Sequence, residues 1–507
     1  MEAEQLAALY DLGLYQSIEI LAPLSVNQAE VMSVNVLMQF AKSLFQIGEY
    51  RRALKYFNIA AEKEKSEPKL NEIKQCSADC LMKLKEDKFA LKILREIHEN
   101  SGPSALSTKS KLVLAKLVAQ TDGKRKAVPF YVEVLRDCPY AIESVFAAID
   151  GGISPLELEN LLKGKLGEMK WVNLLLRAYY SYSKNEYQKA IEKFNELAQS
   201  LPQNLQVLKY LALCHYSAGN YTAAVDYFQK IRQIDTTFVD SMDVFGFILK
   251  SFGKITELNI LSHDLLQASP YRAETWTTIA IYYDAKGKKD VALNHLEKAK
   301  DADPFHYMTY YHQGLCYCYL KQVEQAIRSL NTSKNIHKSL PTYKALTMIH
   351  LSISSIEQAK TVARDAQKIF PNNPSANCLP ALVMAHSNES SDRNKAVELF
   401  QEILKQDPDC LDAVTGLALT YKLTERYNEA TQLLKASIDK FSRDSLYTAL
   451  GDVLFTMEKY DEALINYENA LKLNQSSEAA QSGILNIQKI MQGGTEPTED
   501  TDFEDNA

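Results

Sequence analysis

Few residues in this sequence have a type and spacing that could support chemistry, and the clearest are two cysteines. Cys76 and Cys80 stand four residues apart, so they share one face of a helix. A metal site needs further ligands, and no histidine or other cysteine lies near them in the sequence. Cys316 and Cys318 would point in opposing directions on a helix. We therefore interpret these thiols as small packing residues, and we predict no metal and no cofactor.

Motifs of known catalytic sites are missing as well. The chain contains no GxxxxGKS/T phosphate loop, no GxGxxG turn, no HExxH zinc motif and no GxSxG nucleophile motif. The histidines are scattered, and His306 and His312 form the nearest pair. We interpret both as helix packing residues and predict that the protein is not an enzyme.

The elements that would position any functional side chain are helical hairpins, as one stretch shows. From Ala273 to Pro304 the chain carries a large residue, a small one and an aromatic, then alanine, a bulky residue, alanine and proline. Two packed helices approach closely only where a side chain is small, and Ala280 and Ala292 provide this. Gly287 interrupts the first helix, and Pro304 cannot continue the second. This order, in a unit of about 34 residues, is the tetratricopeptide repeat (TPR) pattern.

The small residue of the second helix recurs along the chain. It falls at Ala53, Ala90, Ala127, Ala190, Ala224, Leu258, Ala292, Ala326, Ala359, Ala396, Ala430 and Ala463. The position numbers rise in steps of 37, 37, 63, 34, 34, 34, 34, 33, 37, 34 and 33. Prolines close many units, at Pro139, Pro202, Pro270, Pro304, Pro371 and Pro408. Four successive identical steps, at the period typical of TPR units, indicate a true repeat rather than chance.

We therefore predict an all-α fold, a TPR solenoid in which antiparallel helix pairs form a superhelix of about 13 to 14 repeats. The irregular parts are a first hairpin at 3–21, extra turns near 64–70 and 100–107, a degenerate hairpin between about 140 and 167, and a capping helix at 477–491. We divide the chain into an N-terminal half (1–170), a C-terminal superhelix (171–491) and an acidic tail (492–507), which we expect to be disordered.

A minority of side chains fall on the face of the first helix that points into the groove of such a solenoid. Tyrosine there offers amphipathic contact area and lysine suits an acidic group, so the set fits an extended peptide or helix. Alternatively, the same residues pack between repeats or face water. The partner-groove candidates are Tyr179, Tyr182, Lys209, Leu213, Tyr216, Phe247, Lys250, Tyr311, Leu315, Lys344 and Lys422.

The composition argues against nucleic acid and membrane as partners. The formal net charge is -7, and residues 494–507 hold six acids and no base, so they carry -6 of it. No basic surplus exists to attract nucleic acid or an anionic membrane. The N-terminus lacks the pattern of a signal peptide, and no apolar run reaches about 18 residues. We expect reduced cysteines and a location in the nucleus and cytoplasm.

Beyond the repeats, several stretches resemble the subunit 7 family of the anaphase-promoting complex, or cyclosome. They occur in the order found in the family and extend over nearly the whole chain. The most specific are FYVEVLRDCPYAIES at 130–144 and VDSMDVFGFILKSFGK at 239–254, because they depart from the general repeat pattern. The others lie at 43–57, 79–94, 273–276 and 450–474. The acidic tail is similar too.

The resemblance implies a noncatalytic scaffold subunit of a large RING-type ubiquitin ligase that drives the cell cycle through mitosis and cell division. It implies a V-shaped homodimer formed through residues 1–170. It also implies that the C-terminal repeats dock on other TPR subunits of the complex, chiefly subunit 3.

A freestanding TPR peptide-binding adaptor, of the co-chaperone or transport type, is the alternative function. Many TPR domains that bind C-terminal carboxylates use a clamp of Lys, Asn, Asn, Lys and Arg on adjacent first helices. This set is not found here, which favours the scaffold.

Overall fold

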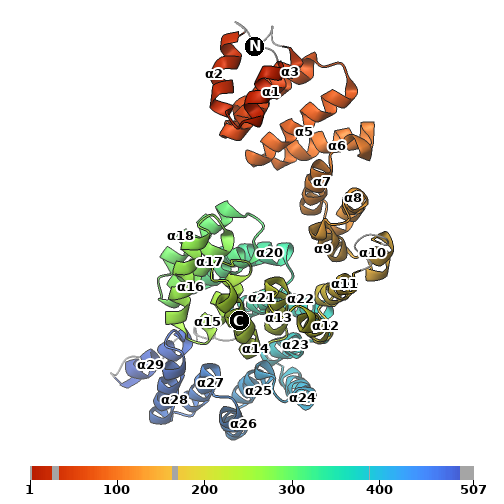
Figure 1. The fold of residues 1–507 in the computed structure, drawn as a ribbon. Coiled ribbons are helices and arrows are strands. Elements are labelled where there is room, and N and C mark those ends of the chain that lie inside the picture. The colour runs from red at the N-terminus through yellow and green to blue at the C-terminus, as the bar shows by residue number, and fades with distance from the viewer. Residues whose placement is uncertain (1–2, 26–32, 163–168, 388, 492–507) are drawn as a thin grey trace. The chain divides into compact units, whose positions relative to one another are not determined.

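The computed structural model describes residues 3–25, 33–162, 169–387 and 389–491. Within these ranges the regular structure consists of helices α1 to α29 and one short 3-10 helix, η1 (Figure 1). The all-α TPR solenoid is thereby confirmed. None of the helices in the described ranges is both long and apolar enough to cross a membrane. The predicted acidic tail, 492–507, lies outside the described residues.

The chain divides into two compact units, Met1–Lys184 and Asn185–Ala507. The sequence placed the division after residue 170, before α11 (Lys170–Ser183). In the structure α11 belongs to the first unit because it packs on α9 and α10. There, Arg177 Nε lies 2.9 Å from Glu159 Oε1.

The helices of the first unit begin and end as follows: α1 (Ala3–Asp11), α2 (Tyr15–Ser25), α3 (Val34–Ile47), α4 (Tyr50–Lys63), α5 (Glu67–Lys83), α6 (Asp87–Ser101), η1 (Pro103–Ala105), α7 (Thr108–Thr121), α8 (Lys124–Asp137), α9 (Ile142–Gly151), α10 (Pro155–Leu161) and α11.

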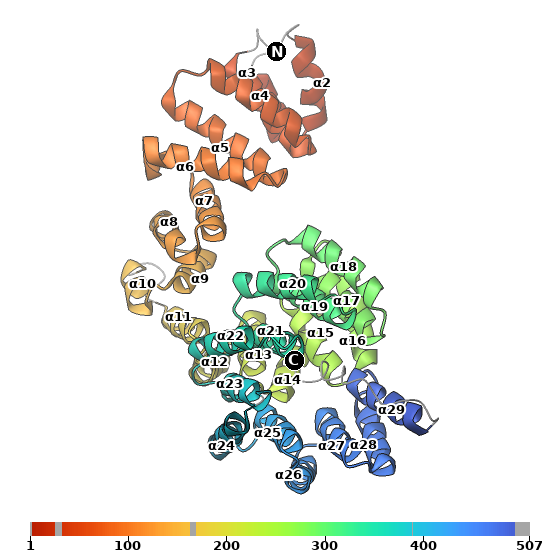
Figure 2. The same cartoon turned by 180° about the vertical axis from the view of Figure 1, so that it is seen from behind.

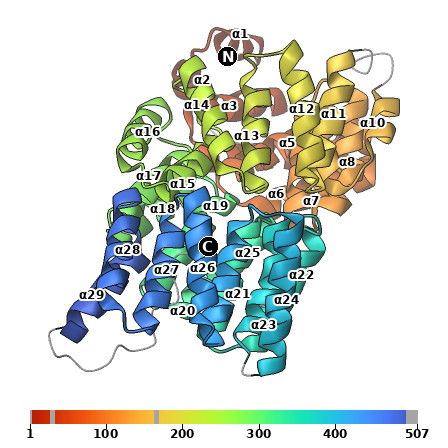
Figure 3. The same cartoon turned by 90° about the horizontal axis from the view of Figure 1, so that it is seen from below.

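Those of the second unit are α12 (Tyr187–Ser200), α13 (Leu205–Ser217), α14 (Tyr221–Ile234), α15 (Met242–Ser251), α16 (Ile255–Ala268), α17 (Ala273–Ala285), α18 (Lys289–Ala302), α19 (Tyr307–Tyr319), α20 (Val323–Ile336), α21 (Leu340–Ser352), α22 (Ile356–Ile369), α23 (Pro374–Ala385), α24 (Ser390–Gln406), α25 (Leu411–Leu423), α26 (Tyr427–Lys440), α27 (Asp444–Thr456), α28 (Tyr460–Leu473) and α29 (Glu478–Met491). Within this unit, α23 to α29 follow one another in chain order in Figure 3.

The repeat frame read from the sequence is confirmed position by position. All twelve tracked residues are fully buried on second helices. Eleven of them are the fourth residue of their helix, as Ala292 is in α18, and Ala396 differs because α24 begins three residues earlier. Each of the six closing prolines stands two residues after its second helix ends, because proline cannot donate the next helical hydrogen bond.

The turn inside each regular hairpin also repeats. One residue with positive φ stands two places before the second helix. It is Gly287 before α18, with φ 72°, and Lys321 before α20, with φ 58°. A left-handed residue therefore closes the first helix of the pair, and glycine is preferred there without being required.

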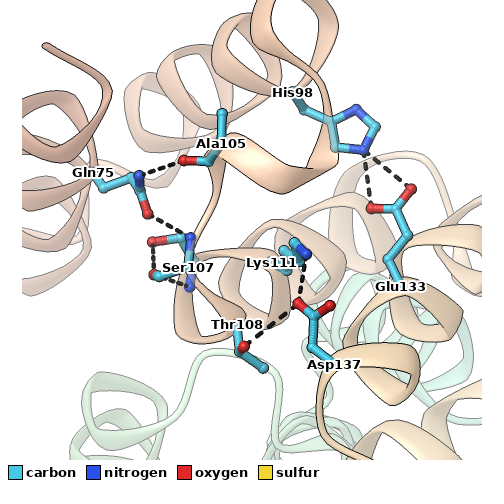
Figure 4. Close-up of polar contacts among 9 residues, drawn as sticks. Gln75, His98, Ala105, Ser107, Thr108, Lys111, Glu133 and Asp137 are labelled. Carbon is cyan, nitrogen blue, oxygen red and sulfur yellow. Dashed lines mark hydrogen bonds and ion pairs between the residues drawn. The ribbon is translucent and has the colours of Figure 1, made fainter. Parts of the chain in front are cut away.

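Several irregular parts of the first unit lie where the sequence placed them, but the extra turn expected near 64–70 is shorter, because α5 begins at Glu67. Gly13 has φ 74° between α1 and α2, and the predicted degenerate hairpin corresponds to α9 and α10, although its end falls in 163–168, outside the described residues. The extra turn near 100–107 contains η1. The side chain of Gln75, on α5, holds this turn through two hydrogen bonds. Gln75 Nε2 donates to Ala105 O at 3.0 Å, and Ser107 N donates to Gln75 Oε1 at 2.9 Å (Figure 4).

Two neighbouring polar contacts join helices in the same part of the first unit. Lys111 of α7 pairs with Asp137 at the end of α8, and His98 Nε2 of α6 lies 3.0 Å from Glu133 Oε2 of α8 (Figure 4). Polar side chains thus hold the hairpins together where the repeat is longer than the regular unit.

The second unit winds tightly enough for distant helices to meet. The side-chain amide of Asn185, just before α12, donates to Ile369 O at the end of α22 at 3.1 Å. Asn373 Nδ2 donates to Ser217 O at the end of α13 at 3.2 Å. Figure 2 shows α12 and α13 beside α22 and α23. The first repeats of this unit therefore form hydrogen bonds with repeats about five units later, from side-chain amides to backbone carbonyls.

Candidate functional site

The predicted partner-groove residues are shared between the two units. Tyr179 and Tyr182 lie on α11 of the first unit. The ring of Tyr179 stacks on Phe146 with 4.2 Å between centroids, and its hydroxyl donates to Asp150 Oδ1 at 3.1 Å. The other nine candidates lie on first helices of the second unit.

Three aromatic candidates meet inside the second unit. Tyr216 of α13, Phe247 of α15 and Tyr311 of α19 form a continuous row in which each neighbouring pair has ring centroids 6.0 Å apart. All three are buried, and Tyr311 is only 1% exposed. Burial raises the pKa of both tyrosines well above its ordinary value. The structure thus places these rings in the core of the unit, with little surface to offer a partner.

Two candidate lysines form ion pairs with aspartates of the next repeat. Lys209 Nζ lies 3.7 Å from Asp240 Oδ2, and Lys250 Nζ lies 2.7 Å from Asp284 Oδ2. Burial lowers the pKa of Lys209 despite this aspartate. The sequence suggested a partner's acidic group for these lysines, and in this chain the acid comes from the solenoid itself.

The remaining candidates have different surroundings. Lys344 of α21 pairs with Asp412 of α25, two repeats later. Leu213 and Leu315 pack, partly buried, against the core around the aromatic row. Lys422 of α25 is half-buried. Binding of a partner by any of the eleven candidates stays a prediction.

The structure also assembles a charged cluster that sequence reasoning missed. Asp284 of α17 lies between two lysines, because its Oδ1 is 2.6 Å from Lys289 Nζ while its Oδ2 faces Lys250. Lys289 also pairs with Glu478, the first residue of α29, 189 residues away in the sequence. Asp284 stands one repeat length after Lys250, so a search for charge pairs at the repeat spacing would find that pair. No sequence pattern indicates Glu478.

The electrostatics of this cluster follow from burial and pairing. Burial alone would raise the pKa of Asp284, but Lys250 and Lys289 outweigh it and hold the pKa well below its ordinary value. Burial would likewise lower the pKa of Lys289, and Asp284 and Glu478 reverse the shift and raise it. Asp284 and Lys289 are therefore charged at neutral pH, in a site where each depends on its partners.

Two histidines lie nearby in contrasting states. His306 Nε2 is 3.3 Å from Asp243 Oδ2, and this carboxylate outweighs burial and raises the pKa of His306. His312 is buried, neither ring nitrogen has a hydrogen-bond partner among the described residues, and burial lowers its pKa to about 4. Of the two histidines noted in the sequence, His306 thus contacts a carboxylate of its own unit and His312 packs in the core.

Cys76 and Cys80 behave as packing residues. Cys80 is fully buried and Cys76 partly so, and burial raises the pKa of Cys76 to about 11 and that of Cys80 to about 12. Both thiols therefore stay protonated at neutral pH, which makes them poor ligands and nucleophiles. Across the described ranges, no group of three or more His, Cys, Asp and Glu side chains is placed to hold a metal ion.

Comparison with known families identifies the repeats. Models described as tetratricopeptide repeat match four stretches of the chain. These are residues 175–237, 273–306, 388–451 and 444–477.

Relatives resemble the chain along almost its full length. Anaphase-promoting complex subunit 7 of Arabidopsis thaliana is 27% identical over 97% of this chain and 94% of that protein. Subunit 7 of Homo sapiens is 25% identical over 97% of this chain and 92% of that protein. Anaphase-promoting complex subunit 3 of Schizosaccharomyces pombe is 24% identical over 60% of this chain and 46% of that protein.

A solved structure shares the fold. The crystal structure of the APC/C hetero-tetramer Cut9-Hcn1 contains a chain with a TM-score of 0.59 and 17% identity, covering 95% of both chains. The repeats, the fold and the relatives agree: the chain carries tetratricopeptide repeats and resembles subunit 7 of the anaphase-promoting complex over nearly its whole length.

Proposed function

We propose that this protein is a noncatalytic TPR scaffold subunit of the anaphase-promoting complex, a cell-cycle-regulated ubiquitin ligase that controls mitosis. The observation that carries the proposal is similarity to subunit 7 over nearly the full chain in plant, amoebal, human and mouse proteins. Full-length similarity includes the irregular hairpins as well as the regular repeats, so it is more specific than a match to TPR units alone.

The mechanism of a scaffold is geometric. Each helical hairpin packs only on its neighbours, so stacked hairpins form an extended support on which partners dock. The chemistry of ubiquitin transfer then belongs to other subunits. We infer that this chain docks on other TPR subunits, chiefly subunit 3, in the nucleus and cytoplasm.

Affinity purification tests membership of the complex. A tagged full-length chain, purified from mitotic cells and analysed by mass spectrometry, should retain the cullin-like and TPR subunits of the ligase. A tag-only purification is the control. Recovery of chaperones or transport factors without ligase subunits would contradict the proposal and favour a freestanding adaptor.

We also propose a homodimer formed through the N-terminal half. Support comes from the first hairpin, where apolar side chains of α2 and of the turn before it are exposed. Leu12 is 72% exposed and Ile20 63%, and Leu14 and Leu21 are exposed beside them. A symmetric pair covers such a self-complementary patch on both copies at once. Multi-angle light scattering at micromolar concentration should give twice the monomer mass, and a strict monomer would exclude the dimer.

A further inference from the structure

The pair of Lys289 and Glu478 joins two helices that the repeat order alone would not bring together. Lys289 is the first residue of α18, and Glu478 is the first residue of α29, the capping helix at the end of the second unit. Beside this pair, α29 packs mainly on α27 and α28, and few of its residues are buried: Ala480, Gly483 and Ile487. The ion pair is thus an attachment of the cap to an earlier part of the solenoid.

The charge balance of the cluster depends on Glu478. Lys250 and Lys289 bring two positive charges and Asp284 brings one negative charge, so these three residues alone carry a net charge of +1. Asp284 and Lys289 are almost fully buried, at 4% and 6% side-chain exposure. An uncompensated buried charge is costly, and Glu478 neutralises it.

The neighbouring groups do not supply a substitute for this carboxylate. His312 is uncharged because burial lowers its pKa to about 4. Lys289 lies over the ring of Tyr319, with Nζ 4.3 Å from the centroid, a contact that stabilises the cation without neutralising it. A carboxylate is therefore the chemical group that this site requires.

We propose that Lys250, Asp284 and Lys289 form a binding site for a carboxylate, which Glu478 occupies in the isolated chain and an acidic side chain of a partner segment takes when α29 is displaced. The capping helix is then a latch that covers the site from within the same chain. This inference concerns contacts inside one unit and does not depend on which complex the chain joins.

Hydrogen exchange of the full-length chain tests the latch. Glu478→Gln leaves two lysines to share one buried aspartate, with one positive charge uncompensated, so amides of α29 and of the first turn of α18 should exchange about tenfold faster or more than in the wild type. Glu468→Gln, an exposed acid on α28, is the matched control and should change neither segment. Unchanged exchange in α29 of the Glu478→Gln variant would overturn the proposal.

A charge-balanced variant separates pairing from packing. Lys289→Met combined with Glu478→Leu removes one charge of each sign, so the site is again neutral, and the cap should regain slow exchange. If the double variant exchanges as fast as Glu478→Gln, shape and not charge holds the helix, and the carboxylate site is refuted. Equal acceleration along the whole second unit would mean general destabilisation and would also refute the latch.

A peptide supplied in trans tests whether the site accepts a foreign carboxylate. The probe is a synthetic peptide of residues 474–491, added to the full-length Glu478→Gln variant. It should slow exchange at the start of α18 at concentrations about tenfold lower than the same peptide with Gln at position 478. Equal potency of the two peptides, or no protection by either, would overturn the site.

Discussion

At the scale of single residues, helices approach one another closely only where one of them carries a glycine or another small residue. Tyr467 of α28 is packed between two glycines on neighbouring helices, Gly451 of α27 and Gly483 of α29. A methyl group at Gly451 would lie 2.6 Å from the ring and one at Gly483 would lie 2.4 Å from it. The Tyr467 hydroxyl meanwhile donates to Asp452 Oδ1 at 2.6 Å. A large buried side chain thus requires small partners on both sides, which is the principle behind Ala280 and Ala292 in the regular hairpin.

Ala292→Leu should overpack the hairpin of α17 and α18, because Ala292 is fully buried between them. We expect the free energy of unfolding to fall by about 1–3 kcal/mol. The measurement is urea unfolding in a Trp171→Phe background, where the remaining tryptophan, Trp276 on α17, reports the second unit. Lys288→Ala is the control, since Lys288 is exposed in the turn and should cost under about 0.5 kcal/mol. Equal losses from both changes would refute the repeat frame.

The buried imidazole of His312 should make the second unit less stable in mild acid. Its folded-state pKa of about 4 lies below the ordinary value of 6.5, so between these values the unfolded chain binds a proton that the folded chain does not. Stability is therefore lost as the pH falls from 7 to 5. The loss should be about 2 kcal/mol larger for the wild type than for His312→Leu, which has no group to titrate.

Urea unfolding at pH 7 and pH 5, followed through Trp276, measures this difference. Carboxylates titrate in both proteins, so the comparison with His312→Leu removes their contribution. Parallel loss of stability in the two proteins would show that the folded and unfolded chains bind the His312 proton equally, so that folding does not lower the pKa of His312.

At the scale of elements, one hairpin carries a large residue at a position where the other hairpins carry alanine. The second helix α16 carries Leu258 where the other tracked positions carry alanine, and the first helix α15 carries Gly246 opposite. A methyl group at Gly246 would lie 3.3 Å from Leu258 Cδ1. The larger residue on α16 is thus matched by the smallest residue on α15, and the pair fills the space that two alanines fill in a regular hairpin.

A double-mutant cycle tests this exchange of size. Leu258→Ala alone leaves a cavity and should cost about 2–5 kcal/mol, and Gly246→Ala alone crowds Leu258 and should cost about 1–3 kcal/mol. Combined, the two changes recreate the alanine pair of the regular hairpins, so the double variant should lose less stability than the sum. Urea unfolding of the full chain supplies all four values. Strict additivity would mean that the two residues do not share one space.

At the scale of the whole molecule, the two units differ in the side chains that they leave available for binding other proteins. The first hairpin of the N-terminal unit leaves apolar side chains exposed. The candidate lysines of the C-terminal unit, by contrast, are largely paired by its own aspartates, as Lys344 is by Asp412. Self-association through the first unit and docking of other subunits on the second are thus compatible within one chain.

The dimer proposal predicts the effect of charge on the first hairpin. Leu12→Asp combined with Ile20→Asp places two carboxylates in the exposed apolar patch, so light scattering should change from dimer to monomer mass. Leu485→Asp, on an exposed position of α29 in the other unit, is the control and should leave the mass unchanged. A dimer that survives the double change forms through a different surface.

The sequence by itself determined the repeat and most helix boundaries, because the signals are local. A buried alanine such as Ala292, a turn residue such as Gly287 and a stop such as Pro304 each act within one hairpin. Their spacing therefore carries through to the structure almost unchanged. The degenerate hairpin and the capping helix were recognisable for the same reason, as interruptions of a regular period.

Only the tertiary structure decided which of the predicted groove side chains are buried or paired within the chain itself. Tyr216 and Tyr311 have the right position in the repeat to face a partner, and the tight winding of the second unit buries them. Lys289 and Glu478 lie 189 residues apart, so no spacing in the sequence connects them. Curvature accumulates from small rotations between many hairpins, and the contacts it creates across the superhelix are invisible within any single repeat.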